Sequence, residues 1–596
     1  MEAVLKKPLT DEDLLERAAI DGRVAFAAAV FLGAAGLVAL LDRVGVPERF
    51  VEVLGSVIAC AGLALVGVLL RSMRVSRFYA GGRAIPPAYA GLAMATIAAG
   101  LFLPFVPPVE GAISLPGLLV GFAGGMALAA LLTGPLLRKT GAFSIPDLIA
   151  GRFPNIALRL GVATVVAAIG LLVAFAGYSA AVTSLVAGLG APRGVAVTAV
   201  GIAIVLVGAP GGLGGAVWAA AGAAGMLVAG LGLPLALLAV RGASLPLPLA
   251  GDRAEWERAL GLMVEWQGAT SGVATAAGAT AIAAIVLGLG SLAPILGPAI
   301  TTADYRSARR GGLAAMAWGL VMAILVAATM AAAALAFDRA MTGARPGDIP
   351  GFVIAASHEG RARICGANPE TPGAAARACA TRAGFRDTLR RGDFAASGAF
   401  LVQALPDLRG LGRAFSGLAI AGFVAVALAL AAAGFHAFAT AVGHDAFYRV
   451  RDETAMTSRR LAVTRLLLVA GVVAAGIVLD LHAPDPRALV GLAIALGAAA
   501  IAPLLLLSLA PRAEGVDATI ALLCGLAAAE TVIFLGGSAP AIDVFAPAAV
   551  IAACVSLVAG LATSLSRRSD PTSRGGAFVQ GVLHGESEVL NPDKGA

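Results

Sequence analysis

The stretch RAFSGLAIAGFVAVALALAAAGFHAFATA, residues 413–441, is an almost unbroken run of apolar and small side chains. A helix of about 20 apolar residues is long enough to cross the roughly 30 Å hydrocarbon core of a bilayer. Similar runs recur along the chain of 596 residues, of which 59% are hydrophobic and only 13% are charged. A soluble domain is about half apolar and about a quarter charged. The sequence therefore predicts an all-α polytopic membrane protein and excludes a soluble enzyme, a coiled coil or a disordered chain.

Roughly fourteen segments have the length and composition expected of transmembrane helices. They lie at about 24–42, 50–70, 89–108, 112–137, 160–189, 194–208, 213–240, 272–298, 311–337, 413–441, 462–480, 488–510, 516–536 and 547–566. An even number of spans places both chain termini on the same side of the membrane.

Basic residues are concentrated in loops that share one side in this arrangement. These loops are 71–88, 138–159, 299–311 and 442–461. Short cytoplasmic loops carry an excess of Arg and Lys in membrane proteins. We therefore expect a multi-pass protein of the cell (inner) membrane, with a cytoplasmic N-terminal extension at 1–23 and a cytoplasmic tail at 567–596.

The loop at 338–412 is long and lies on the opposite, periplasmic side in this arrangement. It contains Cys365 and Cys379, which could form a disulfide in an oxidising compartment. Two unpaired thiols are the alternative, and the sequence leaves both open.

The composition also predicts what the protein does not bind. The chain contains only five His and five Cys, with no paired His at ligand spacing in facing spans, so no haem, metal cluster or other cofactor is expected. The basic residues sit between apolar segments, which indicates membrane lipids and not nucleic acid as a partner.

Five motifs near the predicted membrane boundaries carry a family resemblance. They are RFYAGGRAIPP (77–87), GAFSIPDLIAGRFP (141–154), GGLGGAVW (211–218), TTADYRSARRG (301–311) and VGHDAFYR (442–449). In their order and spacing the chain resembles the sodium/solute symporter family over about residues 50–565. Within that family it is most similar to the cation/acetate symporters. Ser144 in the second motif can also cap a short helix that begins at Ile145.

The resemblance implies a LeuT-type core of two inverted five-helix repeats with extra flanking helices. The repeats are 89–240 and 272–510, with two additional N-terminal helices at 24–70 and further C-terminal helices at 516–566. In such folds the first helix of each repeat is interrupted, which exposes backbone groups to substrate and cation. Gly and Pro residues in spans 89–108 and 272–298 predict these interruptions.

The function implied by the resemblance is secondary active transport and not enzyme catalysis. We expect symport of a small organic solute, such as the monocarboxylate acetate, with a cation and by alternating access. The substrate pathway is predicted to include Thr96, Gly100, Tyr178, Thr183, Ser184 and His436. For His436, a hydrogen-bonded packing role and a proton relay both remain open.

The chain departs from the family at the positions expected to bind the cation and the solute. Ala429 and Leu430 stand where many sodium-coupled members have a hydroxyl pair. Only backbone carbonyls near Thr96, Ala99 and Val426 remain as ligands, so the cation site is degenerate and either Na⁺ or H⁺ could be the coupling ion. Other polar positions of the family are also replaced, at Ile97, Ala174, Pro294 and Pro298.

These departures support an alternative function, a non-transporting sensor or scaffold derived from the symporter fold. A small membrane partner subunit is then expected. Two acids near the membrane, Glu110 and Glu530, have either a functional role or a position at the interface.

Overall fold

The computed structural model describes most of the chain. The described residues are 43–105, 115–241, 252–267, 276–358, 360–382, 385, 387–451, 456–482, 484–536, 541–565 and 574–584, with scattered positions between 22 and 41. Nearly all of the predicted N-terminal extension, about half of the span at 24–42 and Glu110 lie outside them. The same holds for the predicted tail, apart from α24 (Arg574–His584).

The described chain is nearly all helical. Its first half contains α2 (Glu48–Leu69), α3 (Val75–Ala80), η1 (Gly81–Arg83), α4 (Pro87–Phe102), η2 (Leu103–Phe105), α5 (Leu115–Leu128), η3 (Ala129–Thr133), α6 (Gly134–Thr140), α7 (Ile145–Arg152), α8 (Ile156–Leu189), α9 (Arg193–Val240), α10 (Arg253–Gln267), α11 (Ala276–Leu289) and α12 (Ala293–Ile300).

The second half begins with a long helix, continues into a small mixed region and returns to helices. Its elements are α13 (Tyr305–Met341), η4 (Pro346–Asp348), α14 (Gly351–His358), β1 (Ala362–Ile364), α15 (Pro372–Ala380), η5 (Arg391–Asp393), β2 (Phe394–Ala396), α16 (Gly398–Leu408), α17 (Arg413–Thr440), η6 (Ala441–Tyr448), α18 (Arg449–Arg451), α19 (Thr457–Leu481), α20 (Pro486–Leu496), η7 (Gly497–Ile501), α21 (Ala502–Ser508), α22 (Gly515–Gly536) and α23 (Ala541–Leu565).

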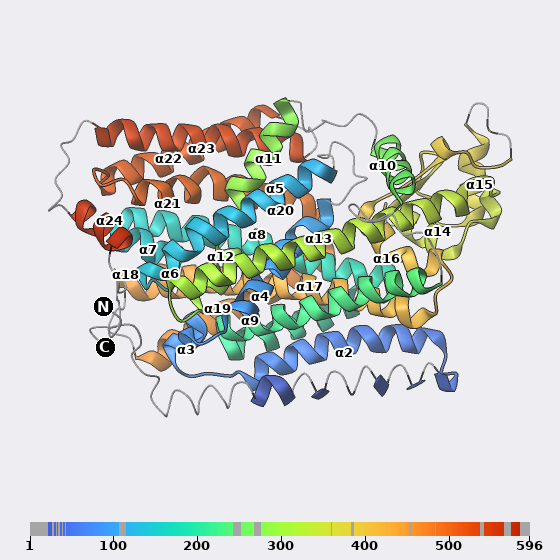
Figure 1. The fold of residues 1–596 in the computed structure, drawn as a ribbon, viewed down its shortest axis with the longest axis horizontal. Helices are drawn as coiled ribbons and strands as arrows, with labels where there is room; N and C mark the ends of the chain where they lie inside the picture. Colours follow the sequence, from blue (N-terminus) through green and yellow to red (C-terminus); the bar gives the residue numbers. More distant parts are fainter. Residues whose placement is uncertain are drawn as a thin grey trace.

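Most long helices run along the long axis of the molecule (Figure 1). Within the described ranges, 10 helices are long and apolar enough to cross a membrane, or 11 if α11 and α12 form one span. This count for the described residues is lower than the roughly fourteen spans predicted from the sequence. The difference arises at the span near 24–42, at α2, whose apolar part is shorter, and at α9, which contains two predicted spans.

α9 is folded back on itself at Gly212. A straight helix of 48 residues would be about 72 Å long, far more than a bilayer thickness of about 40–45 Å. At Gly212 the backbone leaves the helical conformation, with φ 57° and ψ −143°. The two ends of α9 therefore lie on the same side of the molecule. Arg193, at the start of α9, bonds to the Leu479 carbonyl near the end of α19. Gly230, near the end of α9, packs on Leu418 near the start of α17.

The two helices predicted to be interrupted differ from each other. α11 and α12 are bent by 41° at a short break, as predicted for the span 272–298. α4 is continuous from Pro87 to Phe102 and passes Gly100 without a break. The α-helix then changes to the 3-10 helix η2, which contains Pro104, and the rest of the predicted span lies outside the described residues. A Cβ at Gly100 would lie 3.1 Å from Val426 and 3.3 Å from Leu430. The glycine therefore allows α4 to approach α17 closely.

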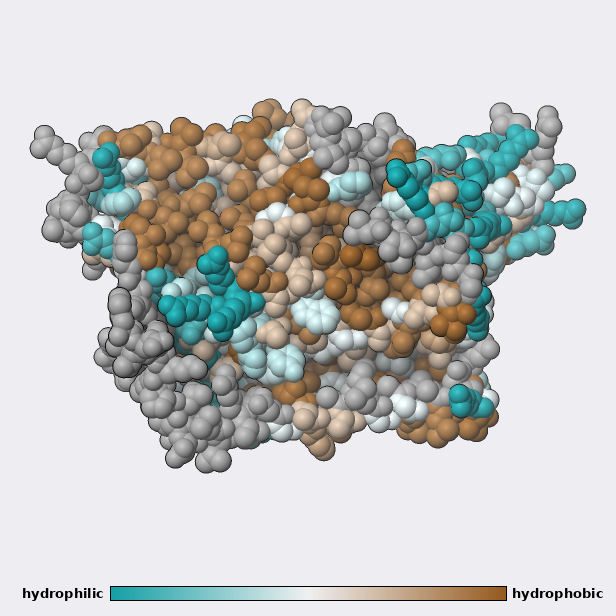
Figure 2. Space-filling view, viewed as in Figure 1, coloured by the Kyte–Doolittle hydropathy of each residue, from teal (hydrophilic) through white to brown (hydrophobic). Residues whose placement is uncertain are grey.

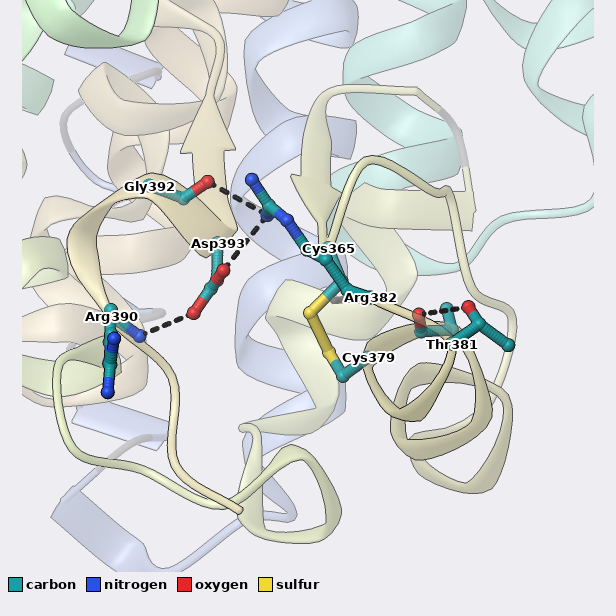
Figure 3. The surroundings of a disulfide bond; sticks show 8 residues. Cys365, Cys379, Thr381, Arg382, Arg390, Gly392 and Asp393 are labelled. Carbon is teal, nitrogen blue, oxygen red and sulfur yellow. Dashed lines mark hydrogen bonds and ion pairs between the residues drawn. A yellow bond between two sulfur atoms is a disulfide. The ribbon is translucent and has the colours of Figure 1, made fainter. Parts of the chain in front are cut away.

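Residues 342–412 form a folded insertion and not a plain loop. β1 and β2 pair antiparallel, and the short helices α14, α15 and α16 surround them (Figure 1). Cys365 and Cys379 are joined by a disulfide, beside an Arg382–Asp393 ion pair of 2.9 Å (Figure 3). Phe337 of α13 packs edge-on against Phe394 and Phe400, which attaches the insertion to the helical core.

The surface divides into two chemically different parts (Figure 2). Apolar residues cover much of the helical body, and hydrophilic residues gather on the insertion. Large apolar side chains are exposed on the outer helices, including Leu466 of α19, Leu523 and Phe534 of α22 and Val558 of α23. A water-soluble protein rarely exposes so much apolar surface, so these faces are suited to lipid.

The four basic loops meet at the end of the molecule opposite the insertion (Figure 1). Arg83 donates to the Gly141 carbonyl at 2.5 Å, and Arg138 donates to the Thr302 carbonyl at 2.6 Å. Arg449 lies 3.5 Å from Asp147. The shared side predicted for these loops therefore agrees with the structure. The placement of this side in the cytoplasm stays a prediction.

Candidate functional site

A cavity of about 370 Å³ lies between the insertion and the helical core. Its core wall comes from three helices: Gly100 of α4, Thr183 and Ser184 of α8, and Phe423 of α17. Its other walls come from Trp266 of α10, the β1–β2 pair and the start of α20. A volume of this size accommodates a small ligand, so we call it the large cavity.

A chain of hydrogen bonds connects the insertion to the core along the wall of the large cavity. Arg361 of the insertion donates from Nη2 to Gln403 Oε1 at 2.7 Å. Gln403 of α16 donates from Nε2 to Ser184 Oγ at 3.2 Å. Gln403 and Ser184 are both buried. The position of the insertion is therefore coupled to α8 through polar groups that would be costly to separate.

The charged side chains of the large cavity are mostly basic. Arg361, Arg363 of β1 and Arg487 of α20 line it, together with one acid, Asp485. Asp485 is paired with Arg487 at 3.1 Å. A cleft lined by an excess of one charge raises the local concentration of the opposite charge. The large cavity is therefore suited to anions.

A second cavity of about 40 Å³ lies at the opposite end of α17, and we call it the small cavity. Its polar lining includes His436 and Thr440 of α17, Asp445 of η6 and Ser144. Pro294 and Gly297 of α12 also line it, so one wall belongs to the bent α11–α12 pair.

The carboxylate of Asp445 is fully buried at the small cavity. Its Oδ1 accepts a hydrogen bond from Ser144 Oγ at 2.7 Å, while Oδ2 has no hydrogen-bond partner among the described residues. Ser144 also accepts from the Asp147 backbone N–H at 3.1 Å, which confirms the helix cap predicted at the start of α7. His436 lies 3.3 Å from Thr440 through Nε2, and its Nδ1 has no partner within the described ranges.

Further charged groups join five elements around the small cavity, namely α7, α8, α18, η6 and α19. Asp147 of α7 lies 3.5 Å from both Arg159 of α8 and Arg449 of α18. Arg460 of α19 is 2.9 Å from His444 Nδ1. These contacts hold the five elements together and close this end of the core.

Tyr79 and Arg152, which lie outside the predicted spans, stabilise the same end of the core. The Tyr79 hydroxyl is 2.6 Å from Thr464 Oγ1, and burial raises the pKa of Tyr79, so the phenol is protonated at neutral pH. Arg152 donates to the carbonyls of Ser508 and Ala510. Burial lowers the pKa of Arg152 to about 10, which still leaves it charged at neutral pH.

Asp147, His444 and Asp445 place three potential metal ligands within 4.8 Å of one another. However, Arg460 faces the His444 ring, and Arg159 and Arg449 face Asp147. A divalent cation would have to bind beside these guanidinium groups, which repel it. The donor set therefore does not fit a metal ion.

The structure brings together some of the predicted site residues and separates others. Gly100, Thr183 and Ser184 line the large cavity, and His436 lines the small one. Thr96 is fully buried and donates to the Leu92 carbonyl of its own helix at 2.8 Å. Tyr178 lies away from both cavities and donates to the Val197 carbonyl of α9 at 2.7 Å.

The predicted cation-binding positions lie in the contact between α4 and α17. Val426, Ala429 and Leu430 are buried there, and the side chains of Val426 and Leu430 occupy the space beside Gly100. Ala99 lies on the facing helix. Glu530 of α22 is exposed, and its functional and interfacial roles both stay predictions.

Sequence reasoning missed the residues that give each cavity its chemistry. Arg361, Gln403 and Arg487 belong to segments that carry no family motif. His444 and Asp445 belong to the motif VGHDAFYR, yet were treated only as the end of a helix. Two ionisable groups at the end of an apolar span are a signal that could have identified them.

Comparison with known proteins finds a short sequence match and a similar overall fold. No family model matches the chain. A stretch of 130 residues is 28% identical to an uncharacterized symporter of Cupriavidus necator, covering 21% of this chain and 18% of that relative. The chain therefore aligns with less than a fifth of the relative's length.

The solved structures include a Na⁺-coupled sialic acid symporter in a substrate-bound, outward-open state. It matches with a TM-score of 0.60 and 14% identity, covering 88% of this chain and 98% of that chain. A manganese transporter of Eremococcus coleocola aligns with a TM-score of only 0.40 and 12% identity, covering 82% of this chain and 94% of that chain. The chain therefore shares its overall helical fold with the solved sialic acid symporter.

Proposed function

We propose that the chain is a secondary active transporter of the sodium/solute symporter family, nearest to the cation/acetate symporters. It moves a small organic anion, a monocarboxylate such as acetate, together with a cation. The insertion faces the periplasm and the basic loops face the cytoplasm of the inner membrane. The solute and coupling ion, with no resident cofactor, are its ligands.

The single observation that carries this proposal is the unequal access to the two ends of the core. The large cavity reaches Gly100 and Ser184 from the insertion end. The other end is closed by the buried groups around Asp147 and His444. Alternating access requires a state that is open at one end and closed at the other.

The solute class follows from the lining of the large cavity. Arg361, Arg363 and Arg487 outnumber Asp485 there, which favours an anion over a cation or a neutral sugar. The cavity extends to apolar side chains of α17, including Phe423 and Ala427. A short carboxylate combines the negative charge and the small apolar body that such a lining accepts.

The proposal is tested by counterflow in proteoliposomes loaded with unlabelled acetate. Radiolabelled acetate should enter faster than into protein-free liposomes, whose uptake is subtracted because acetic acid crosses bilayers unaided. Acetate entry no faster than into protein-free liposomes, whether acetate or another short monocarboxylate is loaded inside, would contradict transport of this solute class.

A specific observation favours the sensor or scaffold alternative. Val426 and Leu430 fill the region where the resemblance places the cation, and neither side chain has an oxygen. A sensor would bind the solute without counterflow and would co-purify with a small membrane partner subunit. Calorimetric binding to the purified protein, measured beside counterflow, separates the two functions.

A further inference from the structure

The small cavity contains two buried polar atoms that the packing does not explain. Asp445 is 0% exposed and His436 is 4% exposed. Asp445 Oδ2 and His436 Nδ1 both have no hydrogen-bond partner in the described part of the chain. Leaving a buried polar atom unsatisfied is costly, so such atoms indicate a role beyond packing.

The volume of the small cavity is suited to water or a proton carrier and not to an organic solute. About 40 Å³ exceeds the roughly 10–15 Å³ that one water needs by the same measure. Water also requires two to four polar partners. The unpartnered atoms of Asp445 and His436, with the hydroxyls of Ser144 and Thr440, supply them.

The protonation state of Asp445 decides whether Oδ2 is satisfied. An ionised carboxylate only accepts hydrogen bonds, so one of its oxygens stays unsatisfied unless a donor reaches it. A protonated carboxyl group carries its own O–H donor and loses the cost of a buried charge. When one proton binds, Oδ2 of Asp445 therefore changes from an unsatisfied carboxylate oxygen to the O–H donor of a neutral carboxyl group.

The charged groups around Asp445 come from every neighbouring element. Asp147 of α7 is the facing acid, and Tyr79 of α3 is a neutral phenol. The basic groups are Arg159 of α8, Arg449 of α18 and Arg460 of α19, and His444 precedes Asp445 on η6. The guanidinium groups stabilise the ionised carboxylate, whereas burial and Asp147 favour the protonated form.

α12 provides the means of coupling this proton to transport. Pro294 and Gly297 line the small cavity on one side, and α12 is separated from α11 by the 41° bend. A movement of α12 would open the small cavity to water and let the proton leave. A π-helix, η6, places Asp445 at this wall, and such turns are frequent at functional sites.

We propose that Asp445 is the proton-binding group that couples transport, with His436 as the group that relays the proton through water in the small cavity. A proton from water at the insertion end passes through His436 and protonates the Asp445 carboxylate, and release returns this proton to water at the end that carries the basic loops. This inference rests on the proposed transport function. It also accounts for the apolar side chains at the predicted cation site, because a proton needs no shell of oxygen ligands.

The first test uses proteoliposomes with an inward pH gradient of one unit and no sodium. Acetic acid that crosses the bilayer unaided reaches the same roughly tenfold end point under this gradient as symport with one proton per solute, so the initial rate of labelled acetate uptake is measured against protein-free liposomes. The pH gradient should raise the initial rate in wild type above the protein-free rate. Asp445→Asn should lose this increase while counterflow remains detectable. Asp517→Asn is the matched control, since Asp517 is equally buried but lies on α22, outside the small cavity. An increase that persists in Asp445→Asn, or that requires a sodium gradient in the wild type, would overturn the proposal.

The second test does not depend on transport. The infrared difference spectrum of wild type minus Asp445→Asn, recorded over a pH titration, should contain the C=O stretch of a protonated carboxyl group that shifts in D₂O. If counterflow fails but this band is present, the proposed transport function is wrong and the proton site stands. If the band is absent at every pH, the proton site is wrong whatever the transport result.

Discussion

The two cavities lie on opposite sides of the same helix contact and differ in almost every property. The large cavity is bordered by the insertion and three arginines, whereas the small cavity is buried and lined by Asp445 and His436. Between them, α8 and α17 pack so closely that glycines replace side chains. This difference indicates that the large cavity selects the solute, whereas the residues around the small cavity close the core and couple transport to the proton.

The largest effect is expected from the contact that separates the cavities. In Gly434→Leu the new Cβ would lie 2.6 Å from the Ala174 N atom and 2.7 Å from the Gly170 O atom, both backbone atoms of α8. Overpacking costs about 1–3 kcal/mol where side chains yield and more where backbone must move. We expect loss of monodisperse protein in size-exclusion chromatography. Gly225→Leu is the control, because a Cβ there meets nothing within 4 Å. Equal elution profiles for both variants would contradict the close contact.

The closed end should be weakened next by removing Arg460. This buried guanidinium faces His444 at 2.9 Å and lies 4.2 Å from the Tyr448 ring. Removing one partner of a buried charged network costs about 3–5 kcal/mol. Arg460→Met should therefore lower the Tm and open the small cavity.

Opening is measured as thiol labelling of Thr440→Cys, with the free cysteines Cys60, Cys524 and Cys554 replaced by Ser. Labelling should increase in Arg460→Met and stay low in Arg459→Met, the exposed neighbouring residue. If both arginine variants label alike, Arg460 does not close the small cavity.

The sequence predicted the closed end better than the open one. The basic loops and the Ser144 cap depend on local patterns, and the structure has both. The large cavity depends on contacts between Arg361, Gln403 and Ser184, which are far apart in sequence and follow no periodicity. The contact of α4 with α17 at Gly100 is hidden for a related reason, because a glycine that permits helix contact and one that breaks a helix look the same in sequence.

The insertion should respond to loss of its disulfide without affecting the closed end. Cys365 and Cys379 enclose a separation of 14 residues, and a loop of about 15 residues gains about 3 kcal/mol from closure. Cys365→Ser with Cys379→Ser should speed limited proteolysis of the insertion. The Thr440→Cys labelling should not change. Cys554→Ser, at an exposed free thiol, is the control. Proteolysis at the wild-type rate would show that the aromatic contacts of Phe337 hold the insertion without the disulfide.

The smallest effect is expected from the charge of the large cavity. Arg363 is exposed at its rim, so Arg363→Glu should raise the KM for acetate about three- to tenfold at low salt and leave kcat nearly unchanged. Screening reduces this change when the ionic strength rises from about 0.01 M to 0.15 M, because the Debye length falls from about 30 Å to about 8 Å. Arg377→Glu makes the same charge change on α15, outside the cavity, and should have little effect. An equal rise in KM for both variants would mean that the net charge of the insertion, and not the lining of the large cavity, attracts the anion.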